Sequence, residues 1–151
     1  MSIYIEIGAD TCLPGESQRI EAAAQATLAH QGISATSELS IIVTDDAQLH
    51  ELNQQFRDVD APTDVLSFPA EFSDPESGAA YLGDVLISYP RVVAQTQSGG
   101  HTPEAELQLL IVHGILHLLG HDHADEAEKN TMWAAQAEIL ATLGVEITPP
   151  A

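Results

Sequence analysis

Histidine is concentrated in one short segment of this chain. Four of the seven histidines fall within residues 113–123, which read H-G-I-L-H-L-L-G-H-D-H. His113 and His117 are four residues apart, and an α-helix places such residues on one face, so both imidazoles can reach one metal ion. Gly120 follows where a glycine commonly ends a helix, which lets the chain turn back toward that ion. The segment therefore predicts a metal site.

Two histidines are candidates for the third ligand. An uninterrupted helix would stack His121 on the first two histidines, whereas the H-x-x-x-H-x-x-G-x-x-H spacing of metzincin zinc sites selects His123. Because Gly120 argues against a continuous helix, we favour His123 and expect His121 and Asp122 to be supporting groups. Imidazole ligands favour one Zn²⁺ ion per chain, and three protein ligands leave a position open for water or substrate.

The residue after the first histidine changes the expected chemistry. Zinc peptidases with the H-E-x-x-H pattern use the glutamate as a general base, and this chain has Gly114 at that position. The sequence therefore disfavours a peptidase of that mechanism. A metal-bound water can still reach a pKa near about 7 and attack a substrate, but its proton acceptor must come from elsewhere.

The chain is strongly acidic. Its 151 residues include 4 Lys and Arg against 23 Asp and Glu, which gives a formal charge of −19. A protein that binds nucleic acid through a broad phosphate footprint should be basic, so composition alone argues against nucleic acid. We expect a single domain over residues 1–151 with no membrane span and no signal peptide. The lone Cys12 is typical of a reducing cytoplasm.

Hydrophobic periodicity predicts four strands and five helices. The expected strands are residues 3–7, 39–44, 64–68 and 82–88. The expected helices are residues 17–31, 47–56, 89–97, 103–119 and 125–143. Pro69 should stop the third strand before an acidic loop at 71–79, and the helix from 103, apolar on nearly every side, should be buried. We therefore predict an α+β fold, with a small mixed four-stranded sheet packed against about five helices and a buried, zincin-like, metal-binding helix at its centre.

Three blocks of this sequence resemble the YbeY family of metal-dependent endoribonucleases. The histidine segment looks like the family's signature. Residues 52–68, L-N-Q-Q-F-R-D-V-D-A-P-T-D-V-L-S-F, resemble its L-N-x-x-[YF]-R and T-D-V-L-S-F-P motifs, and residues 83–88, G-D-V-L-I-S, resemble its G-D-I-x-I-S. The blocks keep the family's order and separations over about residues 3–143.

The resemblance implies a zinc-dependent, single-strand-specific endoribonuclease. It implies zinc bound by His113, His117 and His123, maturation of the 3′ end of 16S ribosomal RNA, and a role in ribosome quality control. RNA, the ribosomal small subunit and an assembly partner are the implied partners. A metal-stabilised ribosome-assembly factor with little turnover is the alternative, and Gly114 weakens a third possibility, a hydrolase of peptides or small molecules.

Arg57 is the residue that the resemblance assigns to the substrate. A guanidinium can hold a phosphate through two hydrogen bonds and stabilise charge in a phosphoryl transition state. The alternative is a surface arginine, or an arginine in an ion pair with Asp58 or Asp60. In the same block, Asp64 and Ser67 are expected either to fix the loop or to orient groups around the metal.

Overall fold

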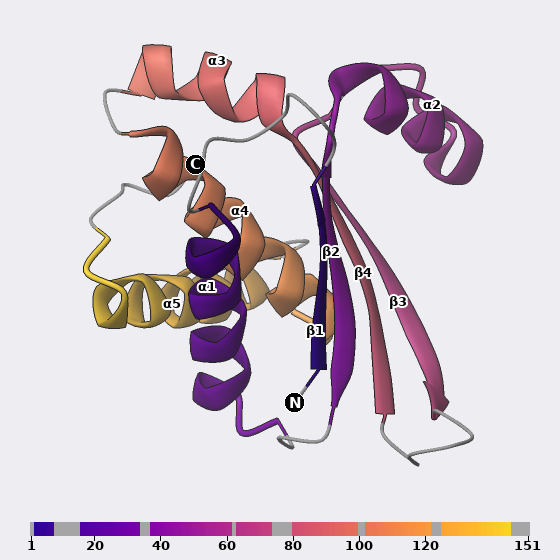
Figure 1. Ribbon diagram of the computed structural model, residues 1–151. Helices are drawn as coiled ribbons and strands as arrows, with labels where there is room; N and C mark the ends of the chain where they lie inside the picture. Colours follow the sequence, from indigo (N-terminus) through magenta and orange to yellow (C-terminus); the bar gives the residue numbers. More distant parts are fainter. Residues whose placement is uncertain are drawn as a thin grey trace.

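The computed structural model describes residues 2–7, 16–33, 37–61, 63–73, 80–99, 102–121 and 125–145 (Figure 1). The strands are β1 (Ser2–Ile7), β2 (Glu38–Thr44), β3 (Val65–Ser73) and β4 (Ala80–Ser88). The helices are α1 (Glu16–His30), α2 (Asp46–Arg57), α3 (Tyr89–Gly99), α4 (Pro103–Leu118) and α5 (Glu126–Thr142). The predicted α+β class and its five helices are confirmed.

The strands form one mixed sheet in the order β1-β2-β4-β3. β1 and β4 both run parallel to β2, and β3 runs antiparallel to β4 at the edge of the sheet. Helices α1, α4 and α5 cover one face, whereas α2 lies on the other (Figure 1). Strand alternation sends Ile41 and Ile87 into the larger core under the three helices. Leu66 and Leu86 point the other way and pack against Leu49 of α2.

Helix α4 begins as its sequence predicts. The Thr102 hydroxyl accepts a hydrogen bond from the Ala105 amide at 3.1 Å, and Pro103 occupies the first turn, where no amide hydrogen is needed. From Glu106 onward almost every side chain is buried, so α4 is the central helix of the larger core. Even so, no helix in the described ranges is long and apolar enough to cross a membrane.

Helix α4 ends at a glycine turn. Gly120 has a φ of +99°, which side chains other than glycine rarely adopt. Its amide donates to the His117 carbonyl at 3.1 Å, and the His121 amide donates to the Leu116 carbonyl at 3.0 Å. This is the Schellman arrangement, which satisfies carbonyls that the helix would otherwise leave unpaired. The prediction that the helix stops at Gly120 is confirmed.

The predicted end of the third strand is wrong. β3 continues through Pro69 to Ser73 and pairs with β4, with a register shift between Pro69 and Phe72. Proline removes one ladder donor, but an edge strand tolerates that loss because one side of it has no partner strand. The predicted loop at residues 71–79 therefore begins later than expected, and residues 74–79 lie outside the described ranges.

Candidate metal centre

Two predicted metal ligands line one hollow beside the edge strand. His113 and His117 lie on consecutive turns of α4, with ring centroids 4.8 Å apart and ring planes at 74°. The hollow measures about 450 Å³, and Arg57, Asp64 and Ser67 line it as well. The structure therefore brings both helical histidines together with the three residues singled out from the end of α2 to the start of β3.

His113 is oriented by a glutamine that the sequence analysis did not select. Its Nδ1 lies 3.0 Å from the side-chain oxygen of Gln136 on α5, and Gln136 is only 1% exposed. An amide oxygen can only accept, so this contact requires a hydrogen on Nδ1, and Nε2 is then the ring nitrogen that carries the lone pair. Histidines that bind metals are usually held in this way. The edge-to-face packing of Trp133, at 5.7 Å, further restricts the ring.

The amide of Gln136 is satisfied on one side only. Its Nε2 has no hydrogen-bond partner among the described residues. Exchanging the amide oxygen and nitrogen would give that nitrogen a partner, but it would place the His113 hydrogen on Nε2, where it would block a metal. The donor set therefore fits a metal ion when the amide is oriented as the structure has it.

Gln136 carries little signal in the sequence. It lies on the buried side of α5 with Met132 and Ile139, whereas glutamine in a helix is normally taken for a surface residue. Its position four residues after Met132 was the available indication, because side chains at that spacing share a helix face.

Ser67 connects the metal-binding helix to Arg57. Its hydroxyl donates to the Gly114 carbonyl at 2.9 Å, one residue after His113. Its own carbonyl accepts a hydrogen bond from Arg57 Nη2 at 3.2 Å. Ser67 is buried, so its bond to Gly114 is shielded from water, whereas the bond from the exposed Arg57 is only partly buried. Strand β3 therefore fixes the guanidinium relative to the turn of α4 that carries the histidines.

Gly114 is where α4 comes closest to the sheet. A Cβ at this position would lie 2.7 Å from Val85 Cγ1 and 3.3 Å from the Ser67 hydroxyl oxygen. Helix and strands therefore leave no room for a side chain there, least of all for glutamate. The absence of the peptidase base thus has a packing reason, and Gly114 is required for the approach that lets Ser67 bond to the helix.

Arg57 is not neutralised by the carboxylates predicted as alternatives. Asp60 lies 2.6 Å from His50 Nε2, and Asp58 occupies the left-handed position that ends α2, with a φ of 58°. Among the residues that the structure describes, Arg57 forms no ion pair with a carboxylate. Its charge is therefore available to a ligand in the hollow.

Asp64 is fixed at the wall of the hollow by two hydrogen bonds. Its Oδ2 accepts from Gln95 Nε2 of α3 at 3.0 Å, and its carbonyl accepts from the Ser88 amide at 2.9 Å. The carboxylate is half-buried. It is thus held close to the metal ligands without contacting them in any hydrogen bond that the described residues form.

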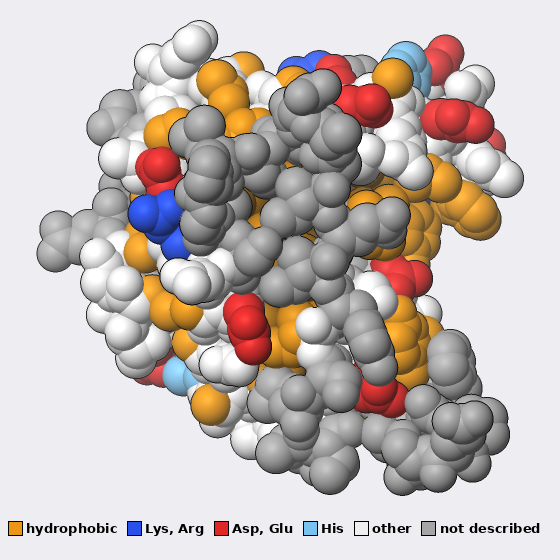
Figure 2. Space-filling view, in the orientation of Figure 1, with side chains coloured by type: hydrophobic (Ala, Val, Ile, Leu, Met, Phe, Trp, Pro, Cys, Tyr) orange, Lys and Arg blue, Asp and Glu red, His pale blue; other side chains and the backbone are white. Residues whose placement is uncertain are grey.

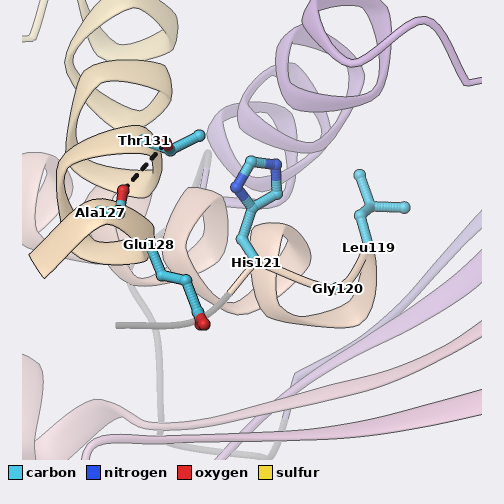
Figure 3. A pocket seen from close by; sticks show the side chains of 6 residues that line it. All are labelled: Leu119, Gly120, His121, Ala127, Glu128 and Thr131. Carbon is cyan, nitrogen blue, oxygen red and sulfur yellow. Dashed lines mark hydrogen bonds between the residues drawn. The ribbon is translucent and has the colours of Figure 1, made fainter. Parts of the chain in front are cut away.

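His121 lies in a different hollow, of about 380 Å³. Figure 3 shows its ring rising from the turn after α4 toward α1 and α5, while Glu128 points away. His121 Nε2 is 2.7 Å from the Gln31 side-chain oxygen at the end of α1. The structure therefore separates His121 from the ring pair of His113 and His117.

The remaining predicted groups, His123 and Asp122, lie outside the described residues. Within the described ranges, no group of three or more His, Cys, Asp or Glu side chains is arranged to hold a metal ion. The two helical histidines are thus the described part of the predicted ligand set, and the third ligand stays a prediction.

The chain is similar to known proteins over most of its length. Residues 13–144 match the family model described as Endoribonuclease YbeY. The Endoribonuclease YbeY of Roseiflexus sp. (strain RS-1) is 48% identical over 139 residues, which cover 86% of this chain and 85% of that protein. The Endoribonuclease YbeY of Chloroflexus aurantiacus is 45% identical and covers 96% and 98%. The solution structure of TM1509 from Thermotoga maritima aligns with a TM-score of 0.59 and 27% identity, over 94% and 91% of the two chains.

Proposed function

Because the chain belongs to the YbeY family, we propose that it is a zinc-dependent endoribonuclease. It cleaves single-stranded RNA in the maturation of the 16S ribosomal RNA 3′ end and in ribosome quality control. One observation carries the proposal: His113 and His117 share a hollow with Arg57, which forms no ion pair with a carboxylate among the described residues. Metal ligands beside a cation that can hold phosphate are what phosphodiester hydrolysis needs.

The metal ligands in this proposal are His113, His117 and His123, around one zinc ion. When bound, zinc supplies Lewis-acid polarisation of a phosphate oxygen and lowers the pKa of a water molecule. Gln136 keeps the Nε2 of His113 free of hydrogen, so that this nitrogen can donate its lone pair. His121 is engaged with Gln31 in the other hollow, which supports the choice of His123 as the third ligand.

Arg57 holds the scissile phosphate. A guanidinium has five N–H donors in a fixed plane, and the Ser67 carbonyl accepts a hydrogen bond from one nitrogen, Nη2. The donors that remain can bind two phosphate oxygens at once and stabilise the charge that develops on them during cleavage. Because Ser67 is itself bonded to Gly114, the phosphate is placed relative to the histidines rather than held at random.

The proton acceptor differs from that of a zinc peptidase, because Gly114 leaves no room for glutamate. Asp64 is the carboxylate that lines the hollow in the described part of the chain, and Gln95 holds its Oδ2. We assign Asp64 the role of orienting water or accepting a proton. Conversion of Asp64 to Asn should reduce cleavage but leave zinc binding intact.

The acidic composition favours one alternative. A chain of charge −19 has a weak electrostatic attraction for RNA. This suits a metal-stabilised assembly factor that reaches ribosomal RNA in the cytoplasm through a protein partner and turns over little. That factor would associate with ribosomal particles and would not cleave RNA.

A metal-depletion experiment tests the proposed function. The purified protein is incubated with a labelled single-stranded oligoribonucleotide and with the same strand in a duplex, before and after removal of metal by a chelator. We expect cleavage of the single strand, loss of cleavage in the chelated protein, and recovery on addition of Zn²⁺. Cleavage that survives complete metal removal would contradict the proposal, and its absence in the zinc-loaded protein would favour the assembly factor.

A further inference from the structure

Two large hydrophobic side chains are exposed in the described part of the chain, and they flank Arg57. Phe56 is 61% exposed and Val59 is 46% exposed. We propose that Phe56 and Val59 form a subsite for an unpaired nucleobase, next to the phosphate that Arg57 holds. This inference rests on the proposed function and adds the part of the RNA that the protein recognises.

The apolar pair is continuous with the metal hollow. Val59 lines that hollow together with Arg57 and His113. Phe56 directly precedes Arg57 in the last turn of α2 and packs edge-to-face on Phe68, with ring centroids 5.5 Å apart. Figure 2 shows hydrophobic side chains reaching the surface beside α2, at the right of the view. A nucleotide whose phosphate contacts Arg57 would thus have apolar surface within reach of its base.

The loop that carries Val59 is held by hydrogen bonds to Asn53. Helix α2 ends with Asp58 in the left-handed conformation, and the Val59 amide donates to the Asn53 carbonyl at 3.2 Å. The buried Asn53 side chain in turn donates to the Ala61 carbonyl at 2.9 Å. Exposed apolar groups on a preorganised backbone lose little conformational freedom when they bind a ligand.

The charge of the protein explains why a base, rather than a run of phosphates, is the ligand here. Arg91 is occupied by Asp46, with Nε 2.9 Å from Oδ1, and Arg57 is the cation that lines the hollow in the described ranges. Phosphate contacts can therefore contribute little affinity. Stacking on an aromatic ring needs no positive charge and accepts every base. Because base pairing keeps bases stacked inside an RNA duplex, such a subsite also favours single-stranded RNA.

The experiment compares Phe56→Ala and Phe56→Trp with the wild type, on an intact single-stranded oligoribonucleotide and on strands that lack one base at successive positions. Gln55→Ala, at an exposed neighbouring position of α2, is the matched control. Loss of one stacking contact should raise KM for the intact strand by about fivefold to a hundredfold in Phe56→Ala. The kcat should not change, Phe56→Trp should restore KM, and Gln55→Ala should behave as the wild type.

The abasic strands identify the contact. At one position of the strand, removal of the base should raise the KM of the wild type by the same factor as Phe56→Ala does on the intact strand. For Phe56→Ala itself, removal of that base should not raise KM any further. An unchanged KM in Phe56→Ala would overturn the proposed subsite but not the proposed endoribonuclease function. An absence of cleavage by the wild type would overturn both proposals. The nucleobase subsite would also be overturned if Phe56→Ala cleaved bare RNA normally but acted poorly on ribosomal particles. That result would assign the surface to a protein partner.

Discussion

The two hollows of this protein use histidines from the same eleven residues in different ways. The hollow beside β3 contains His113 and His117 with Arg57, Asp64 and a buried glutamine behind the first ring. The hollow between the end of α4 and α5 contains His121, whose ring nitrogen is engaged by Gln31. One arrangement gathers two imidazoles beside an arginine, and the other uses a single imidazole to join the end of α4 to the end of α1.

The difference arises from a single turn. If α4 continued past Gly120, His121 would stack on His117 and point into the same hollow. The left-handed turn at Gly120 instead directs His121 toward α1. A cluster of histidines in sequence therefore divides into separate sites when a helix ends within it.

The largest expected effect distinguishes the two hollows directly. His117→Ala should remove zinc from the purified protein and lower RNA cleavage to the level of the metal-free protein, because two imidazoles bind zinc far more weakly than three. His121→Ala should retain zinc. Metal content by elemental analysis checks both variants, and loss of zinc from His121→Ala would show that His121 is a ligand after all.

Arg57 should have the next largest effect. Arg57→Ala should lower kcat/KM by about a hundredfold to a thousandfold, the usual loss when one donor to a developing charge is removed. Zinc content should not change. Arg91→Ala is the matched control, since it removes an arginine that is paired with Asp46 outside the hollow. A similar loss of cleavage in both variants would mean that general charge, rather than the position of Arg57, matters.

Gln136 should have a smaller effect that is specific to the metal. Gln136→Leu removes the acceptor for His113 Nδ1 and should weaken zinc affinity by about tenfold to a hundredfold, as measured by chelator competition. Gln136→Glu keeps an acceptor and should keep the affinity. Gln108→Leu, at the other buried glutamine among the described residues, should leave it unchanged. Equal losses in both leucine variants would indicate a general packing defect.

The smallest effect belongs to the His121 hollow. His121→Ala loses its hydrogen bond to Gln31, which should lower the free energy of unfolding by about 1 kcal/mol. Urea denaturation of the zinc-free protein measures this change without a contribution from the metal. The comparison of the hollows would fail if stability stayed constant while cleavage fell.

Local patterns in the sequence predicted most of the fold. Alternation identified β1, and the glycine at position 120 identified the end of α4. Asp45 caps α2, because its side chain accepts a hydrogen bond from the Gln48 amide. Asp46 instead pairs with Arg91, and that hydrogen bond holds the pKa of Asp46 below its ordinary value.

What local patterns missed depends on which elements meet in three dimensions. Gln136 orients His113 only because α5 packs against α4, and a sequence separation of 23 hides that contact. Pro69 was taken as a strand end because the position of β3 at the edge of the sheet could not be known. Arg57 was selected through a family resemblance, and the pairing of Asp60 with His50, which takes one candidate partner away from Arg57, emerged only in the folded chain.

The proline within β3 has a consequence for how molecules of this protein behave toward one another. An open edge strand offers a row of backbone donors and acceptors on which another chain can add a strand. Pro69 has no amide hydrogen, and the register shift beside it interrupts the regular ladder. The edge of the sheet next to the metal hollow is therefore a poorer template for a strand from another molecule of this protein.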